Sequence, residues 1–307
     1  MSKSSTTKGL IIAVIAAASF GASGAFIKPL LEAGWSPAAA VTVRVLVGGV
    51  VLAPFALVSL RGKWDAVWRG RWRILGMAGI GVAGTQLAYF AAIERIPVGT
   101  GILLEYIAPL LLVAVVWART RHTPKAVVLI GSVIALAGLV LVVSPGGGGG
   151  LDTLGLFFGI LAMIGCAVYY VVAARPSDGL PSVALAAFGL LLGGILLGVV
   201  GLLGIVPFTG YYGELPLFGV SVQWWVPMLI VGVIATALAY ATSIAATEIL
   251  GSRLASFAGL LEVVAGTFYA WILLGEQLAL WQLVGGALIL VGIAFVRSEK
   301  QEPVLAH

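Results

Sequence analysis

The sequence predicts an all-α integral membrane protein with ten transmembrane helices, arranged as two inverted five-helix repeats with both termini in the cytoplasm. Three observations lead to this prediction. Of the 307 residues, 61% are hydrophobic and only 9% are charged, which leaves too few charged side chains to cover a soluble protein of this size. Long apolar stretches follow one another with short connectors between them, and the two halves of the chain resemble each other.

The apolar stretches have the length that a bilayer requires. A hydrocarbon core about 30 Å thick is crossed by a helix of roughly 20 apolar residues. In chain order we expect spans at residues 9–29, 37–60, 74–93, 97–117, 125–143, 154–174, 181–206, 224–246, 252–274 and 279–297. The first stretch follows Lys3 and Lys8 as in a signal peptide, but we expect it to be retained because it recurs in the second half. The aromatic segment 208–223 is expected to be an interfacial loop.

The basic residues predict the orientation of these spans, because Lys and Arg favour the cytoplasmic side of short membrane loops. Lys28 and Arg95 fall on the outer side and Arg44 falls within a span. With the N-terminus inside, the other fourteen of the seventeen basic residues lie on cytoplasmic segments: Lys3, Lys8, Arg61, Lys63, Arg69, Arg71, Arg73, Arg119, Arg121, Lys125, Arg175, Arg253, Arg297 and Lys300. An odd number of spans would spoil this agreement. We therefore expect a multi-pass protein of a bacterial-type inner membrane.

A run of five glycines after Ser144 and Pro145 marks the junction between two repeats. We expect a first repeat at 1–143, a Gly-rich linker at 144–153, a second repeat at 154–297 and a cytoplasmic tail at 298–307. Gly9 and Gly155 open the two copies, and an ungapped offset of 154 aligns residues 91–142 with the second half. On this offset Ala91, Ala92, Glu94, Trp117, Leu129, Gly131, Leu136, Gly138 and Val142 meet identical residues. Because each copy holds five spans, the second must enter the membrane from the opposite side, as is typical of secondary transporters.

Two motifs carry a family resemblance. Residues 96–109 read Ile-Pro-Val-Gly-Thr-Gly-Ile-Leu-Leu-Glu-Tyr-Ile-Ala-Pro, and residues 251–262 read Gly-Ser-Arg-Leu-Ala-Ser-Phe-Ala-Gly-Leu-Leu-Glu. Together with Leu-Leu-Gly-Glu at 273–276 they resemble the EamA family of the drug/metabolite transporter superfamily, over residues 9–297. The stretch 104–109 is most similar to the threonine/homoserine exporters. The resemblance implies a ten-helix carrier that moves amino acids, related metabolites or toxic compounds, usually outward, around a cavity between the repeats.

Two carboxylates are expected deep in the membrane. Glu105 lies about 10 Å along its helix from Val98, and Glu262 about 15 Å along its helix from Ser252. Each can line a cavity and bind an ammonium group or a proton, or can tie one helix to another by a hydrogen bond. Arg44 can pair with either carboxylate or can pack with its stem in the bundle. Pro109 cannot donate to the carbonyl of Glu105, so the helix can kink there.

Polar side chains recur at helical spacing in the third and eighth spans. The first stripe comprises Thr85, Gln86 and Tyr89, and the second comprises Thr236, Tyr240 and Ser243. In lipid such stripes should face protein or water. Both contain Thr-X-Leu-Ala-Tyr, which favours a shared cavity between the two tyrosines, although interhelical hydrogen bonding alone is the alternative. Phe20, Tyr169 and Tyr170 can form aromatic walls for a cation or an aliphatic group, or can simply pack.

Motifs for enzymatic chemistry are missing from the sequence. There is no phosphate-binding loop, no metal-ligand spacing and no Ser-His-acid set, and no histidine falls in a span. The single cysteine, Cys166, excludes an internal disulfide. We therefore expect neither an enzyme nor a protein that binds a cofactor, a metal or nucleic acid.

The expected function is secondary-active transport of a small polar metabolite, with an amino acid or related compound as the first candidate. Export by alternating access, with protons as the coupling ion, is the working hypothesis. Glu105, Thr85, Gln86, Tyr89, Tyr240, Thr236, Tyr169 and Phe20 are the candidate substrate contacts, and Glu105, Glu262 and Arg44 the candidate coupling or ion-pair group. The alternatives are a multidrug or cation exporter, a facilitative uptake carrier and a membrane structural or assembly protein.

Overall fold

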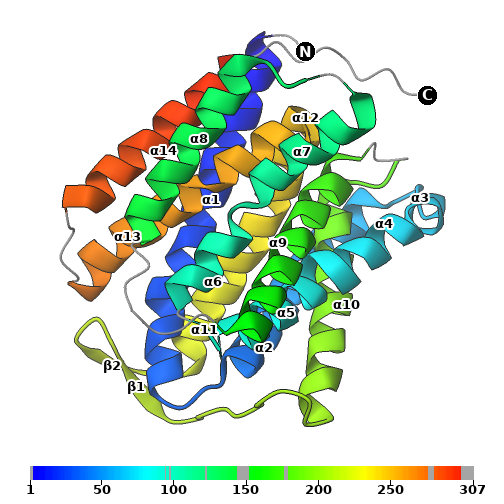
Figure 1. Ribbon diagram of the computed structural model, residues 1–307. Helices are drawn as coiled ribbons and strands as arrows, with labels where there is room; N and C mark the ends of the chain where they lie inside the picture. Colours follow the sequence, from blue (N-terminus) through cyan, green and yellow to red (C-terminus); the bar gives the residue numbers. More distant parts are fainter. Residues whose placement is uncertain are drawn as a thin grey trace.

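The computed structural model describes residues 3–93, 95–96, 98–121, 123–143, 152–175, 179–275 and 280–298. The chain forms a bundle of helices with one small hairpin at one end (Figure 1). In chain order the elements are α1 (Lys3–Glu32), α2 (Pro37–Ser59), α3 (Asp65–Arg69), α4 (Arg71–Gly76), η1 (Met77–Gly84), α5 (Thr85–Ile93), α6 (Val98–Glu105), α7 (Ala108–Thr120), α8 (Ala126–Val143), α9 (Thr153–Ala174), α10 (Ser182–Leu202), β1 (Glu214–Leu217), β2 (Val220–Gln223), α11 (Trp225–Gly232), η2 (Val233–Leu238), α12 (Ala239–Gly259), α13 (Leu261–Leu274) and α14 (Leu280–Ser298).

The described helices account for the apolar stretches. Seven helical segments are long and apolar enough to cross a membrane, and three shorter apolar helices follow the same pattern at Ala126–Val142, Leu261–Leu274 and Leu280–Val296. The seventh predicted span is shorter than expected, since α10 ends at Leu202. Most of the expected linker, 144–151, and the tail after Ser298 lie outside the described residues. The described residues resume at Asp152, whose side chain caps α9 by accepting a hydrogen bond from the Leu154 amide.

The fourth and ninth predicted spans are each broken in two. Between α6 and α7 the Ile107 amide bonds to the Leu104 carbonyl at 3.2 Å, three residues back rather than four. Between α12 and α13 the Leu260 amide bonds in the same way to the Phe257 carbonyl at 3.1 Å. A three-residue bond tightens the turn and shifts the direction of the helix. The breaks therefore fall at matching places in the two repeats.

The third and eighth predicted spans each contain a π-helical segment. The first, η1, joins α4 to α5, and the second, η2, joins α11 to α12. Such segments are rare, and they often occur at functional sites because they widen the helix and redirect its side chains. The α12 helix also bends at Gly251, whose φ of 77° lies in the left-handed region that favours glycine.

The aromatic segment before the eighth span holds a hairpin that the sequence did not predict. Strands β1 and β2 pair antiparallel, and Phe218 and Gly219 form the turn with φ values of 50° and 85°. Leu215 and Leu217 are buried against Leu30 and Trp35, so this packing holds the short strands in place. The hairpin is therefore attached to the bundle by a small apolar core that it shares with the end of α1 and the start of α2.

Helices α8 and α14 pack closely and antiparallel through glycines. A Cβ atom added to Gly138 would lie 2.5 Å from the carbonyl oxygen of Gly285, and one added to Gly131 would lie 2.8 Å from that of Gly292. Under the offset of 154, Gly285 is the equivalent of Gly131 and Gly292 is the equivalent of Gly138. Gly131 thus meets the equivalent of Gly138, and Gly138 meets the equivalent of Gly131. This reciprocal pattern is the one that a twofold axis produces.

The first helix of each half packs against the other half. Helix α1 lies along α12 and α13, whereas α9 lies along η1, α5 and α6 (Figure 1). Helix α2 packs against its counterpart α10, where Gly49 meets Leu191 and Gly194 meets Leu46. This exchange joins the two repeats into one bundle.

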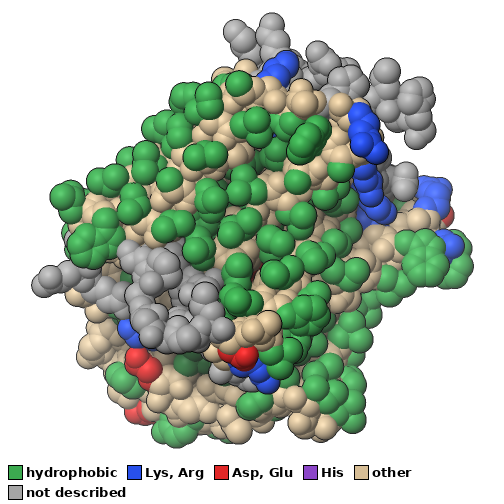
Figure 2. Space-filling view, viewed as in Figure 1, with side chains coloured by type: hydrophobic (Ala, Val, Ile, Leu, Met, Phe, Trp, Pro, Cys, Tyr) green, Lys and Arg blue, Asp and Glu red, His purple; other side chains and the backbone are tan. Residues whose placement is uncertain are grey.

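The surface agrees with a membrane protein. Figure 2 shows hydrophobic side chains over the sides of this face, while most of the visible Lys and Arg side chains gather toward the end where α1 begins. The start of α1 and the end of α14 lie at this same end of the bundle, and the hairpin lies at the opposite end (Figure 1). Large apolar side chains such as Val50, Phe55 and Ile195 are more than half exposed, as lipid contact requires.

Candidate functional site

A large cavity lies between the two halves of the bundle. Its volume is about 650 Å³, which falls within the range of small-molecule sites. Ile27, Lys28 and Leu31 near the end of α1 and Pro37 at the start of α2 line one part of it. The cavity therefore runs from the middle of the bundle to the end at which α1 terminates.

Both predicted carboxylates line this cavity, each beside a helix break. Glu105 is the last residue of α6, and Glu262 is the second residue of α13. The hydroxyl of Tyr106 lies next to the Glu262 carboxylate, so the residue at one break faces the carboxylate at the other. Because discontinuous helices place their ends at the centre of the membrane, these breaks expose polar groups where hydrocarbon would otherwise surround them.

Arg44 contributes a positive charge to the same cavity. Its Nη1 atom donates a hydrogen bond of 2.9 Å to Ser23 Oγ on α1. Within the described residues it forms no ion pair with Glu105 or Glu262, and its buried Nε atom has no hydrogen-bond partner. Of the two alternatives for Arg44, the pairing with a carboxylate is thus not made in this structure. The guanidinium keeps donor capacity for another group.

Aromatic side chains from three helices form one wall of the cavity. The rings of Phe20 and Tyr240 meet edge to face at 5.1 Å, and those of Tyr169 and Tyr240 at 5.8 Å. Tyr169 also contacts Tyr170, and its hydroxyl donates a 2.8 Å hydrogen bond to Ser243 Oγ. These contacts hold the rings in fixed orientations. The wall can accommodate a cation or an apolar group.

Of the two polar stripes, most residues reach the cavity but one does not. Thr85, Gln86 and Tyr89 line it, and so do Tyr240 and Ser243. Thr236 is fully buried within η2, next to Gly48 on α2, and is not among the lining residues. The π-helical segment explains the difference, since it changes the face that a residue presents relative to a regular helix. The hydroxyl of Thr85 donates to the Ile80 carbonyl, five residues back, at 2.7 Å.

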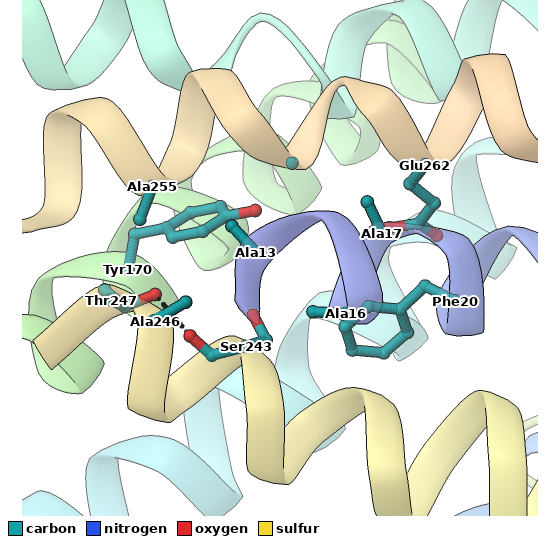
Figure 3. Close-up of a pocket in the computed structure, with 11 residues that line it drawn as sticks. Ala13, Ala16, Ala17, Phe20, Tyr170, Ser243, Ala246, Thr247, Ala255 and Glu262 are labelled. Carbon is teal, nitrogen blue, oxygen red and sulfur yellow. Dashed lines mark hydrogen bonds between the residues drawn. The ribbon is translucent and has the colours of Figure 1, made fainter. Parts of the chain in front are cut away.

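A second, much smaller pocket lies on the other side of the aromatic wall. Its volume is about 20 Å³, and residues of α1, α9, α12 and α13 line it (Figure 3). Phe20, Tyr170, Ser243 and Glu262 line both cavities, and small side chains such as Ala13 and Ala16 complete the smaller one. On α1 the described lining of the large cavity starts at Phe20, so the cavity ends at this wall on the side where α1 begins. A Cβ atom at Gly259 would collide with the Tyr170 hydroxyl, so glycine is needed at this position.

Sequence reasoning did not select Ser23, Tyr106 or Thr267, which also line the cavity. Ser23 and Thr267 are single polar residues in apolar helices and give no periodic signal. Tyr106 follows Glu105 directly and in an unbroken helix would point about 100° away from it. The break between α6 and α7 brings both residues to the cavity. Cys166 lines the cavity as well.

A protein-family model matches both halves of the chain. The model of the EamA-like transporter family matches residues 7–144 and again residues 153–298. The chain belongs to this family. The two matched segments lie on either side of the glycine run at residues 146–150. The expected resemblance to EamA transporters is therefore confirmed.

Related proteins agree with this assignment. The chain is 24% identical to an uncharacterised inner membrane transporter of Salmonella typhimurium, YicL, over 97% of both chains. It is 24% identical to an uncharacterised transporter of Archaeoglobus fulgidus over 93% of this chain and 95% of that one, and 20% identical to one of Clostridium kluyveri over 93% and 91%. A solved crystal structure shares the fold with a TM-score of 0.75, at 20% identity, over 96% of this chain and 98% of that chain.

The family match and the apolar helices of the described residues together indicate a multi-pass membrane protein of a transporter family. None of the three named relatives is described as a threonine or homoserine exporter, so that branch stays a prediction. Among the described residues, no three His, Cys, Asp or Glu side chains gather in a way that could hold a metal ion.

Proposed function

We propose that this EamA protein is a secondary carrier of a small zwitterionic metabolite, with an amino acid or a close relative as the first candidate. One observation carries the proposal: a single cavity in the middle of the bundle contains Arg44, Glu105 and Glu262 within an aromatic wall. A guanidinium group recognises a carboxylate, and a carboxylate recognises an ammonium group. A site with both signs of charge suits a substrate that carries both.

The proposal includes ten spans in two inverted repeats. The seven long and three shorter apolar helices together supply ten segments. The reciprocal approach of Gly131 to Gly292 and of Gly138 to Gly285 supports the inversion, because two copies inserted in the same direction would not form antiparallel α8–α14 contacts. We place both termini in the cytoplasm of a bacterial-type inner membrane, since basic side chains favour that side.

Transport by alternating access follows from this arrangement. Among the described residues, the cavity lining reaches Leu31 and Pro37 near the end where α1 terminates and stops at Phe20 toward the end where α1 begins, which supports a state open at the first of these ends. Rocking of one repeat against the other would reverse the exposure. For export against a gradient, we propose that Glu105 exchanges a proton for the ammonium group of the substrate.

Counterflow in proteoliposomes tests the carrier function. Vesicles loaded with unlabelled threonine, homoserine or another amino acid should take up the labelled compound faster than empty vesicles. The reason is that the carrier binds internal substrate and reorients with it to the outer side, where it can bind labelled substrate again. A double variant Glu105→Gln/Glu262→Gln should remove the acceleration. Uptake that internal substrate does not accelerate, for every compound in a screen of amino acids and amines, would exclude this function.

A multidrug or cation exporter is the second candidate, and a specific observation favours it. Glu105 and Glu262 lie in the cavity beside an aromatic wall, and this combination suits a hydrophobic amine. The variant Arg44→Gln separates the two candidates. It should abolish counterflow of an amino acid, which needs a partner for its carboxylate, and should leave counterflow of an amine intact.

A further inference from the structure

An ion pair outside the cavity joins three helices at the closed end of the bundle. Arg73, in the first turn of α4, donates from Nη2 to Glu248 Oε1 of α12 at 2.8 Å. Its Nε and Nη2 atoms also donate to the carbonyls of Val172 and Ala173 in the last turn of α9, both at 2.9 Å. Arg73 is only 6% exposed and Glu248 26%. One side chain thus ties α4, α9 and α12 together.

The internal repeat relates the two helices that Arg73 joins, α9 and α12, to α1 and α5 in the first half. The offset that relates Gly9 to Gly155 makes the last turn of α9, which contains Ala174, the counterpart of the end of α1, which contains Lys28. The offset of 154 makes the part of α12 that contains Ser243 the counterpart of the part of α5 that contains Tyr89. At the open end, Lys28 and Tyr89 both line the cavity. At the open end, α1 and α5 therefore both border the cavity. Their counterparts in the other repeat are α9 and α12, and Arg73 bonds to both of these helices at the closed end.

We infer that Arg73 and Glu248 form a clamp that holds this end of the carrier shut. The inference rests on the proposed alternating access. To open the closed end as the other end is open, α9 must move away from α12 at this level. Arg73 cannot then keep its bonds to the α9 carbonyls and to Glu248 together. The clamp stabilises the state with the cavity open at the end where α1 terminates, and its loss shifts the population toward the opposite state.

Two features suit the clamp to this role: Arg73 is buried, and it donates to carbonyls at the C-terminal end of α9. A buried arginine without its carboxylate partner leaves an uncompensated charge, so removal of one partner has a large effect. Arginine is also a good partner for the free carbonyls at a helix C-terminus, where the partial charge is negative. Arg73 and Glu248 are positioning residues, because neither lines the large cavity.

The only cysteine of the chain provides a reporter. Cys166 lines the large cavity, so a membrane-impermeant thiol reagent should reach it from the open side. The labelling rate of the full-length protein can be measured in right-side-out and in inside-out vesicles. Cys166→Ser gives the background. Labelling from each side reports the population of each state and requires neither substrate nor transport.

The decisive variant is Glu248→Gln. It should lower the labelling rate from the open side about tenfold and raise the rate from the other side, as expected when the charge partner of a buried arginine is lost. Glu248→Asp, which keeps the charge, should restore much of the wild-type pattern. Asp65→Asn is the matched control, because Asp65 pairs with Arg69 near the same end, where both side chains are more than half exposed. It should leave both rates unchanged.

Unchanged rates from both sides in folded Glu248→Gln protein, or an equal fall from both sides, would overturn the clamp. If Glu248→Gln is not recovered as a folded monodisperse protein, Arg73→Lys takes its place. It keeps the charge but loses the paired donors to α9, and its open-side rate should lie between those of the wild type and the background. A wild-type rate would overturn the clamp. A failure of counterflow, in contrast, would remove the proposed function without altering the labelling result.

Discussion

The two broken helices of the bundle share the position of the break but differ in where they place the carboxylate. Glu105 ends α6, whereas Glu262 lies in the first turn of α13. A helix carries partial positive charge at its N-terminus and partial negative charge at its C-terminus. Negative charge is therefore better tolerated at Glu262 than at Glu105. Under the proposed function, we expect Glu262 to hold the cationic group of the substrate and Glu105 to exchange a proton for it.

Loss of the Glu262 charge should have the largest effect on substrate binding. We expect Glu262→Gln to weaken affinity about 10- to 100-fold, because a hydrogen bond to a charged group contributes about 1.5–3 kcal/mol. Ligand-dependent thermal shift of the purified protein measures this change. Glu214→Gln in the hairpin, where the carboxylate accepts bonds from Ser221 and Gln223, is the control. If Glu262→Gln binds the substrate as tightly as Glu214→Gln does, the charge of Glu262 does not hold the substrate.

Glu105→Gln should change affinity less, by about 3- to 10-fold, since the helix C-terminus already opposes charge there. Its main effect should be on pH dependence. In the wild type, transport driven by a proton gradient should vary with pH, and in the variant this variation should flatten. Flux measurements across a pH series in proteoliposomes report the profile. A variant with full rate and an unchanged profile would remove Glu105 from coupling.

Gly259 occupies the position equivalent to Glu105 in the second repeat, under the offset of 154. A Cβ atom there would meet the Tyr170 hydroxyl, so Gly259→Ala should displace that ring and destabilise the fold by about 1–3 kcal/mol. A lower thermal midpoint would show this. Gly79→Ala is the control, because no atom lies within 4 Å of the added Cβ. Equal midpoints for the two variants would mean that the second break has room for a side chain.

The smallest effects are expected at the tyrosines of the two polar stripes. Tyr89→Phe and Tyr240→Phe should each weaken binding about 2- to 10-fold, since a neutral hydrogen bond contributes about 0.5–1.5 kcal/mol. Tyr211→Phe in the hairpin segment should have no effect, because the Tyr211 side chain lies outside the cavity lining. Binding titrations compare the three variants. If only one of Tyr89 and Tyr240 matters, the two repeats contribute unequally to the site.

Much of the site could be predicted from the sequence because polar residues are costly in a membrane. Glu105, Glu262 and Arg44 stand out in apolar stretches, and all three line the same cavity. Thr236 was selected by the same reasoning but does not line the cavity, because a π-helical segment changes its face. Tyr106 and Ser23 were not selected, because their place depends on the helix break and on the approach of α1 to α2.

The sequence by itself determined the class of the protein, the division into two halves and the approximate helical stretches. Hydrocarbon imposes these features locally, since each apolar stretch must satisfy its own backbone hydrogen bonds within a helix. Only the tertiary structure decided which end of the cavity is open, that Arg44 bonds to Ser23, and that Arg73 joins α9 to Glu248. These contacts connect residues far apart in the chain, and their geometry depends on how the helices pack.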